Sequence, residues 1–168
     1  MKTIVLGLGN TILRDDGAGI YVARALGERL GGGADVREAE LAGLDLIEML
    51  KGYDRAYIVD AIQLDGEDAG VVFRMKADDI RTTPRLASFH DIDIVTALAL
   101  GRRLQFHMPE EVVIFGVQAE DTLTLGEQCT DAVARVIPLV AAEIAAEIAG
   151  TPHERISISL SERKNSRA

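Results

Sequence analysis

Residues 2–30 read KTIVLGLGNTILRDDGAGIYVARALGERL. The run KTIVLGL at its start is apolar and β-branched, which predicts a strand over residues 2–8. Further along, Ile20, Ala23 and Leu26 recur at helical spacing, which predicts a helix over residues 16–30. A glycine-rich turn joins the two elements. The stretch therefore predicts a strand, a tight turn and a helix, the unit from which helix-covered sheets are built.

The rest of the chain continues this alternation of strands and helices. The run RAYIVDAI, residues 55–62, is almost continuously apolar, as strands covered on both faces are. The extended run at 70–75 follows a loop too short for a crossover helix, so we expect it to pair antiparallel with a neighbour. Further strands are predicted at 35–39 and 110–117, and further helices at 43–52, close after His90 and over 126–150.

These elements predict one α/β domain over residues 1–150, followed by a mobile polar tail over residues 151–168. The expected architecture is a three-layer α/β/α sandwich. Its sheet is expected to be mixed, mostly parallel and five-stranded.

The charge balance excludes several classes of partner. The 168 residues include 18 Lys and Arg against 27 Asp and Glu, a net charge of -9, which opposes binding to nucleic acid and to anionic membranes. A lone Lys2 before a short apolar run is no secretion leader, and no apolar segment is long enough to span a bilayer. The single cysteine, Cys129, cannot form an internal disulfide. We therefore expect a cytoplasmic protein, and a monomer.

The glycine-rich turn GLGNTILRDDGAG, residues 7–19, differs from a dinucleotide-binding loop. Such a loop needs a third glycine where this chain has Ile12. Asp15 and Asp16 also lie where the helix start would have to attract phosphate. One of these two aspartates can cap the helix, which leaves the other to be explained.

Three side chains are candidates for a shared site beyond the carboxyl ends of the strands. Asp16 follows the first strand, Asp60 follows the apolar run AYIV, and His90 precedes a helix. A divalent cation removes the repulsion between neighbouring carboxylates. Two oxygen ligands and one imidazole suit nickel or zinc in an open site. The alternatives are that Asp60 only accepts backbone hydrogen bonds and that His90 is a helix cap or a half-buried histidine.

Four motifs in order resemble the hydrogenase maturation endopeptidases, which remove the C-terminal extension from the large-subunit precursor of nickel-iron hydrogenases. These are GLGNTILRDDGAG, VDA around Asp60, SFH ending at His90 and IFGVQ at 114–118. The resemblance implies an endopeptidase of the aspartyl type in which Asp16, Asp60 and His90 bind metal and serve catalysis. It also implies that the precursor supplies the nickel, and that zinc or cadmium can substitute in the isolated protein. Ala119 departs from the pattern, because many relatives carry proline there, and we expect it to loosen the loop.

The sequence offers few nucleophiles for an acyl-enzyme. Ser88 is the only serine before the tail, and no GxSxG motif occurs. Ser88 with His90 is a conceivable dyad, whereas Cys129 is expected to be a small structural side chain in a helix. The remaining route is attack by water on a peptide carbonyl, with metal assistance and a carboxylate as base. The competing hypotheses are a non-catalytic nickel-handling or scaffold protein with the same three residues, and a nucleotide-binding enzyme on a similar frame.

Overall fold

The computed structural model describes residues 1–27, 29–40, 43–77 and 94–159. In this part of the chain, six strands form one sheet in the order β2-β1-β3-β5-β4-β6. Strands β1, β2, β3 and β5 run parallel, and β4 pairs antiparallel with β5 as predicted. The strands are β1 Thr3–Leu8, β2 Asp35–Ala39, β3 Arg55–Ile62, β4 Val72–Lys76, β5 Glu111–Gln118 and β6 Ile158–Ser159.

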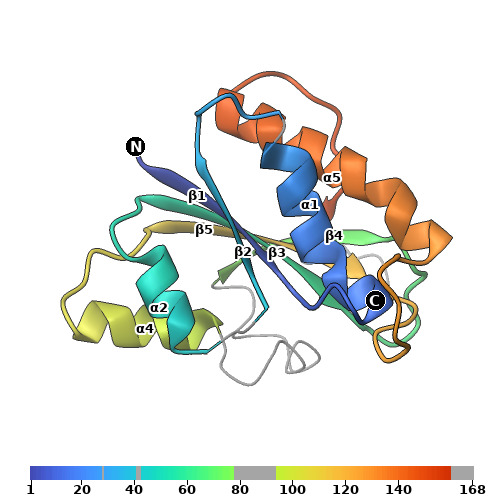
Figure 1. Ribbon diagram of the computed structural model, residues 1–168. Helices are drawn as coiled ribbons and strands as arrows, with labels where there is room; N and C mark the ends of the chain where they lie inside the picture. Colours follow the sequence, from blue (N-terminus) through green and yellow to red (C-terminus); the bar gives the residue numbers. More distant parts are fainter. Residues whose placement is uncertain (28, 41–42, 78–93, 160–168) are drawn as a thin grey trace, which may run out of the picture.

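Helices cover both faces of the sheet (Figure 1). Helix α1 (Ala18–Gly27) packs against α5 (Asp131–Ala149) on one face, while α2 (Asp45–Leu50) and α4 (Ile94–Arg103) lie together on the other. A short 3₁₀ turn, η1 (Arg14–Gly17), leads into α1. The predicted three-layer α/β/α sandwich is confirmed. None of the described helices combines the length and the apolarity that a bilayer span requires.

Strand β3 lies in the middle of the hydrophobic core. Tyr57 and Val59 belong to the apolar cluster under α1 and α5, whereas Ala56 and Ile58 belong to the cluster under α2 and α4. Alternate side chains of one strand therefore fill both layers. This explains why residues 55–62 have no alternating polar face, and it confirms the prediction of a strand buried on both sides.

The prediction of five strands is wrong by one. The additional strand, β6, comes from the segment expected to be a mobile tail, and it pairs with β4 through Phe73 and Ile158. Glu143 of α5, only 2% exposed, accepts hydrogen bonds from the backbone N–H groups of Ile156 (3.0 Å) and Ser157 (3.1 Å). A buried carboxylate on the preceding helix thus holds this segment against the sheet. Residues 160–168 of the expected tail lie outside the described part of the chain.

Candidate active site at the carboxyl edge of the sheet

The glycines of the first turn allow α1 to sit directly on the strand ends. A Cβ added at Gly19 would overlap the backbone oxygens of Leu8 in β1 and Val59 in β3, and one at Gly7 would overlap the backbone oxygen of Gly19. Gly9 also has a φ of +136°, in a region that disfavours other residues. These contacts fix the start of α1, and the η1 turn before it, against the carboxyl ends of β1 and β3.

Asp15 is a structural residue. Its side chain is 0% exposed and accepts four hydrogen bonds: from the backbone N–H groups of Glu120 (2.9 Å), Asp121 (3.0 Å) and Thr130 (2.6 Å), and from the Thr130 hydroxyl (2.9 Å). It therefore ties η1 to the loop after β5 and to the residue before α5. No side-chain hydrogen bond caps η1 itself, and the Asp15 side chain instead binds Thr130 at the start of the last helix.

Asp16 and Asp60 lie on neighbouring elements of this edge. Asp16 is half-buried in η1, which packs against β3. Asp60 is 1% exposed and lies inside β3, one residue beyond the last pair of β1 and β3, Gly7 with Val59. Its Oδ1 accepts a hydrogen bond from the Ala61 N–H at 2.9 Å. The expectation that both carboxylates come to the same edge of the sheet agrees with this placement.

His90, the third residue of the predicted set, and Ser88 of the conceivable dyad both lie outside the described residues. Their roles stay predictions.

Gln118, the last residue of the IFGVQ motif, fixes the loop that follows Asp60. Its side-chain oxygen accepts a hydrogen bond from the Leu64 N–H (2.9 Å), and its side-chain nitrogen donates to the Leu64 carbonyl (3.1 Å). Next to it, Ala119 is buried, and its N–H donates to the Ile62 carbonyl at 2.8 Å. A proline at position 119 would lack this donor. Ala119 therefore ties the loop down, and the expectation that it loosens the loop is wrong.

Asp121 is a residue that the sequence did not single out. Its Oδ1 accepts hydrogen bonds from the backbone N–H groups of Thr124 (3.0 Å) and Leu123 (3.2 Å), and its Oδ2 lies 3.3 Å from an Arg14 guanidinium nitrogen. The hydrogen bonds from Thr124, followed by those from Leu123 and the charge of Arg14, lower the pKa of Asp121 to about 2. The loop after β5 is thus organised around a fixed negative charge beside η1.

Cys129 has the properties of a structural thiol. Burial, and then the charge of Asp15, raise the pKa of Cys129 to about 11, so the nucleophilic thiolate is scarce at neutral pH. The thiol donates to the Arg14 carbonyl at 3.6 Å. The residue lies in the loop before α5 and not within the helix, which corrects the sequence prediction of its position.

A second group of potential ligands lies on α5 and in the segment that follows it. Glu143, Glu147 and His153 bring one ligand atom each within 4.8 Å of one another. The carboxylate of Glu147 is already paired with Arg74 through two hydrogen bonds of 3.0 and 3.1 Å, and Glu143 holds the backbone before β6. Because these oxygens have partners, the group is explained as a structural network that anchors the last strand.

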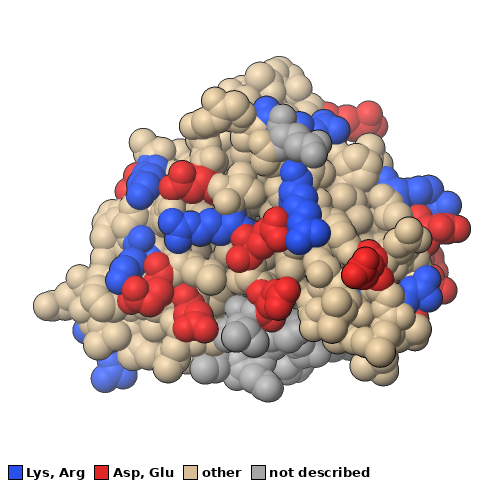
Figure 2. Space-filling model, viewed as in Figure 1, with Lys and Arg blue, Asp and Glu red and all other residues tan. Residues whose placement is uncertain are grey.

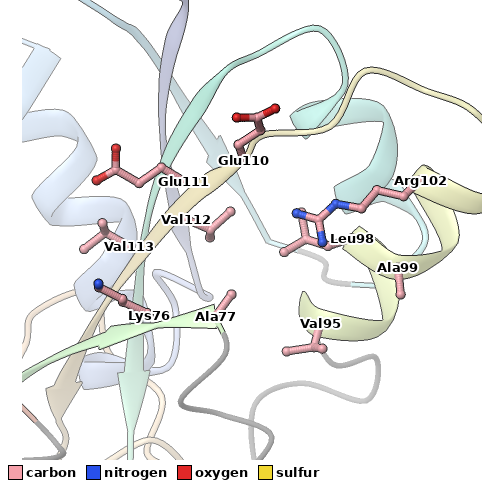
Figure 3. Close-up of a pocket in the computed structure, with 10 residues that line it drawn as sticks. All are labelled: Lys76, Ala77, Val95, Leu98, Ala99, Arg102, Glu110, Glu111, Val112 and Val113. Atoms are coloured by element: carbon pink, nitrogen blue, oxygen red, sulfur yellow. The ribbon is translucent and has the colours of Figure 1, made fainter.

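A surface cavity of about 410 Å³ opens between α4 and the first residues of β5 (Figure 3). Val95, Leu98 and Arg102 line it from α4, and Glu111 and Val113 from β5. Asp60, in contrast, is level with Gly116 further along β5. The cavity is therefore displaced toward the amino end of the strand, away from the edge that carries Asp16 and Asp60.

Charged groups on the face drawn in Figure 2 alternate in sign. Lys and Arg lie between Asp and Glu over the described part of this face, without a continuous basic surface. On this face, the distribution gives a phosphate backbone little to bind.

Comparison with known proteins identifies the family. A family model described as hydrogenase maturation protease matches residues 20–147. The hydrogenase expression/formation protein HupD of Rhizobium leguminosarum bv. viciae is 26% identical over 141 residues, which cover 82% of this chain and 69% of HupD. The hydrogenase 2 maturation protease of Escherichia coli K12 is 24% identical over 123 residues, covering 71% of this chain and 74% of that protein.

Solved structures agree in fold. The E. coli hydrogenase maturating endopeptidase HybD superposes with a TM-score of 0.74 at 22% identity, covering 89% of this chain and 93% of HybD. The [NiFe] hydrogenase maturation protease HybD from Thermococcus kodakarensis gives a TM-score of 0.70 at 30% identity, covering 89% and 99% of the two chains. With most of its length matched by the family model and its fold shared with these proteases, the chain belongs to the hydrogenase maturation protease family.

Proposed function

We propose that this enzyme removes the C-terminal extension from the large-subunit precursor of a nickel-iron hydrogenase after nickel insertion, and that it recognises the bound nickel through Asp16, Asp60 and His90. Family membership supports the precursor as substrate. The observation that supports this site is that the adjacent residues Asp15 and Asp16 lie in different environments. All four hydrogen bonds of buried Asp15 are structural, whereas half-buried Asp16 lies in the turn that packs against the strand of Asp60.

The donor set fits a metal ion carried by the substrate. Two carboxylates and one imidazole form an incomplete coordination shell, which leaves positions for groups of the precursor. Nickel accepts imidazole and carboxylate ligands, and in the isolated protein we expect zinc or cadmium to occupy the same residues. We propose that the enzyme acts as a monomer in the cytoplasm. Size-exclusion chromatography of the purified protein would test the oligomeric state.

The cleavage that we propose is a hydrolysis. Water adds to the carbonyl carbon of the scissile peptide, one carboxylate of the site accepts a proton from that water, and the proton passes to the leaving amine as the C–N bond breaks. Cys129 takes no part, because its raised pKa keeps it as the thiol. Asp16, Asp60 and His90 would hold the metal carried by the precursor, and a metal bound there would supply Lewis-acid polarisation of the peptide carbonyl.

Intact-mass measurement of a nickel-loaded precursor incubated with the protein tests this proposal. The wild-type chain should shorten the precursor, and Asp16→Asn, Asp60→Asn and His90→Ala should slow cleavage by about 100-fold or more, the scale of a lost acid, base or ligand. Asp45→Asn is the matched control, because Asp45 is exposed on α2 and should be neutral.

Each part of the proposal has its own refuting result. Full processing by all three site variants would refute the ligand assignment. Equal cleavage of nickel-free and nickel-loaded precursor would refute nickel recognition. Nickel-dependent binding without any change of precursor mass would instead support the non-catalytic nickel-handling or scaffold alternative.

A further inference from the structure

Three loops meet at the carboxyl edge of the sheet, and their charge is strongly one-sided. Residues 9–17 contain two acidic residues, residues 63–71 contain three, and residues 119–130 contain three. The only basic residue in these loops is Arg14, and it is paired with Asp121. These three loops therefore carry a surplus of carboxylates over basic groups.

The same loops expose three large apolar side chains, which we call the apolar loop patch: Ile12, Leu123 and Leu125. Their exposed fractions are 52%, 88% and 76%. The two loops that carry these side chains are joined by a backbone hydrogen bond, from the Gly126 N–H to the Ile12 carbonyl at 2.9 Å. Isolated exposed leucines are common on protein surfaces, but here two of them flank one residue of a single loop.

The loop that carries both leucines is held in one conformation. Asp121 accepts the backbone N–H groups of Leu123 and Thr124, and the Arg14 N–H donates to the Gly126 carbonyl at 2.8 Å. Buried Asp15 anchors the first residues of the loop. A rigid loop that presents apolar side chains to water loses little conformational entropy when a partner covers them, so it is suited to binding.

The patch also adjoins the candidate catalytic residues. The Asp15 N–H donates to the Asp121 carbonyl at 3.0 Å, and Asp16 is the next residue along η1. On the other side, the Thr122 hydroxyl lies 3.4 Å from the side-chain oxygen of Gln63, in the loop that follows Asp60. A polypeptide with its scissile bond near Asp16 and Asp60 is therefore within reach of the loop that carries these leucines.

We propose that the apolar loop patch docks a segment of the hydrogenase large-subunit precursor in which apolar side chains are flanked by lysine or arginine. The inference rests on the proposed function. The leucines supply the apolar contact, and the surplus of carboxylates on the three loops selects a basic partner and repels an acidic one. The patch thus contributes to affinity for the precursor, while Asp16 and Asp60 act at the bond to be cut.

Steady-state cleavage of the nickel-loaded precursor, read by intact mass, tests the docking role. The double variant Leu123→Ala/Leu125→Ala should raise KM by about 10-fold or more with kcat unchanged, as expected when only uniform binding is lost. Leu139→Ala is the matched control, because Leu139 is 48% exposed on α5 and lies outside the three loops. A KM within about threefold of wild type, or a loss confined to kcat, would overturn the proposal.

A charge variant tests the same surface without touching the leucines. Glu120→Gln/Glu127→Gln removes two exposed carboxylates from the third loop and should raise KM and weaken its dependence on salt. An unchanged KM and salt dependence would overturn the choice of a basic partner.

Failure of the proposed function can be told apart from failure of the docking inference. If the wild-type chain leaves the precursor uncut, the proposed function fails, and equilibrium binding of the same precursor replaces KM. Weaker binding of the precursor by Leu123→Ala/Leu125→Ala than by wild type would then still support the docking surface. Equal binding by the two proteins, or no binding by wild type, would overturn it.

Discussion

Replacing each of the two adjacent aspartates by asparagine should give opposite phenotypes. In Asp15→Asn, the side-chain oxygen can keep the three hydrogen bonds that Oδ2 accepts, from Glu120, Asp121 and the Thr130 hydroxyl. Each becomes a neutral hydrogen bond and weakens by about 1 kcal/mol. The amide nitrogen then faces the Thr130 N–H in a partly buried position, a donor against a donor, at a further cost of about 1–3 kcal/mol.

The expected loss of stability for Asp15→Asn is therefore on the order of 4 kcal/mol, a large part of the 5–15 kcal/mol that holds a typical domain together. For a chain of this size, that loss lowers Tm by roughly 8–16 °C. Asp16→Asn changes a half-buried side chain without altering its shape, so its Tm should stay within about 3 °C of wild type.

Two measurements decide the matter: thermal unfolding followed by circular dichroism, and precursor processing followed by intact mass at a temperature where both variants are folded. Asp15→Asn should process the precursor once corrected for its folded fraction, and Asp16→Asn should be folded but inactive. A wild-type Tm for Asp15→Asn would refute the clamp. Wild-type processing by Asp16→Asn would refute its place in the site.

Three further predictions concern packing, the thiol and the last strand. Gly19→Ala should destabilise the fold by about 1–3 kcal/mol, because the new methyl group meets backbone of both β1 and β3; Gly27→Ala at the other end of α1 meets nothing within 4 Å and should not lower Tm. Cys129 should resist iodoacetamide at pH 7 in the folded protein, and its contribution to stability should fall as pH rises from about 8.5, the unfolded pKa, toward its folded pKa of about 11. Rapid labelling at pH 7 would contradict this. Glu143→Gln should release β6, seen as faster hydrogen exchange at Ile158, whereas Glu154→Gln, an exposed neighbour, should not.

The sequence predicted the elements whose pattern is local. Residues 55–62 are apolar on both faces because β3 has helices on both sides, and the antiparallel β4 followed from the length of one loop. Strand β6 escaped prediction because ISISL, residues 156–160, is the only alternating run in an otherwise polar segment, and a run this short does not show whether the chain pairs with a sheet. Its position depends on Glu143 and on the free edge of β4, which are contacts that only the folded chain brings together.

In the candidate site, too, the sequence predicted some features, whereas others depend on contacts between residues far apart in the chain. That Asp16 and Asp60 reach one edge of the sheet could be predicted, since carboxyl ends of parallel strands share that edge. The role of Asp15 could not, because its partners Glu120, Asp121 and Thr130 are more than 100 residues away along the chain. The sequence presented Gln118 only as part of a motif. The structure shows its role, because its side chain forms two hydrogen bonds with the loop after β3.

The 3₁₀ geometry of η1 explains why neighbouring aspartates serve different ends. With three residues per turn, consecutive side chains point about 120° apart, so Asp15 and Asp16 cannot both reach the same partners. Asp15 enters the interior and clamps the loop after β5, and through Asp121 the same clamp holds the apolar loop patch in place. Because the loop after β5 depends on one buried carboxylate, a change at Asp15 should lower stability and, through the apolar loop patch, raise the KM for the precursor, whereas a change at Asp16 should abolish processing without lowering stability.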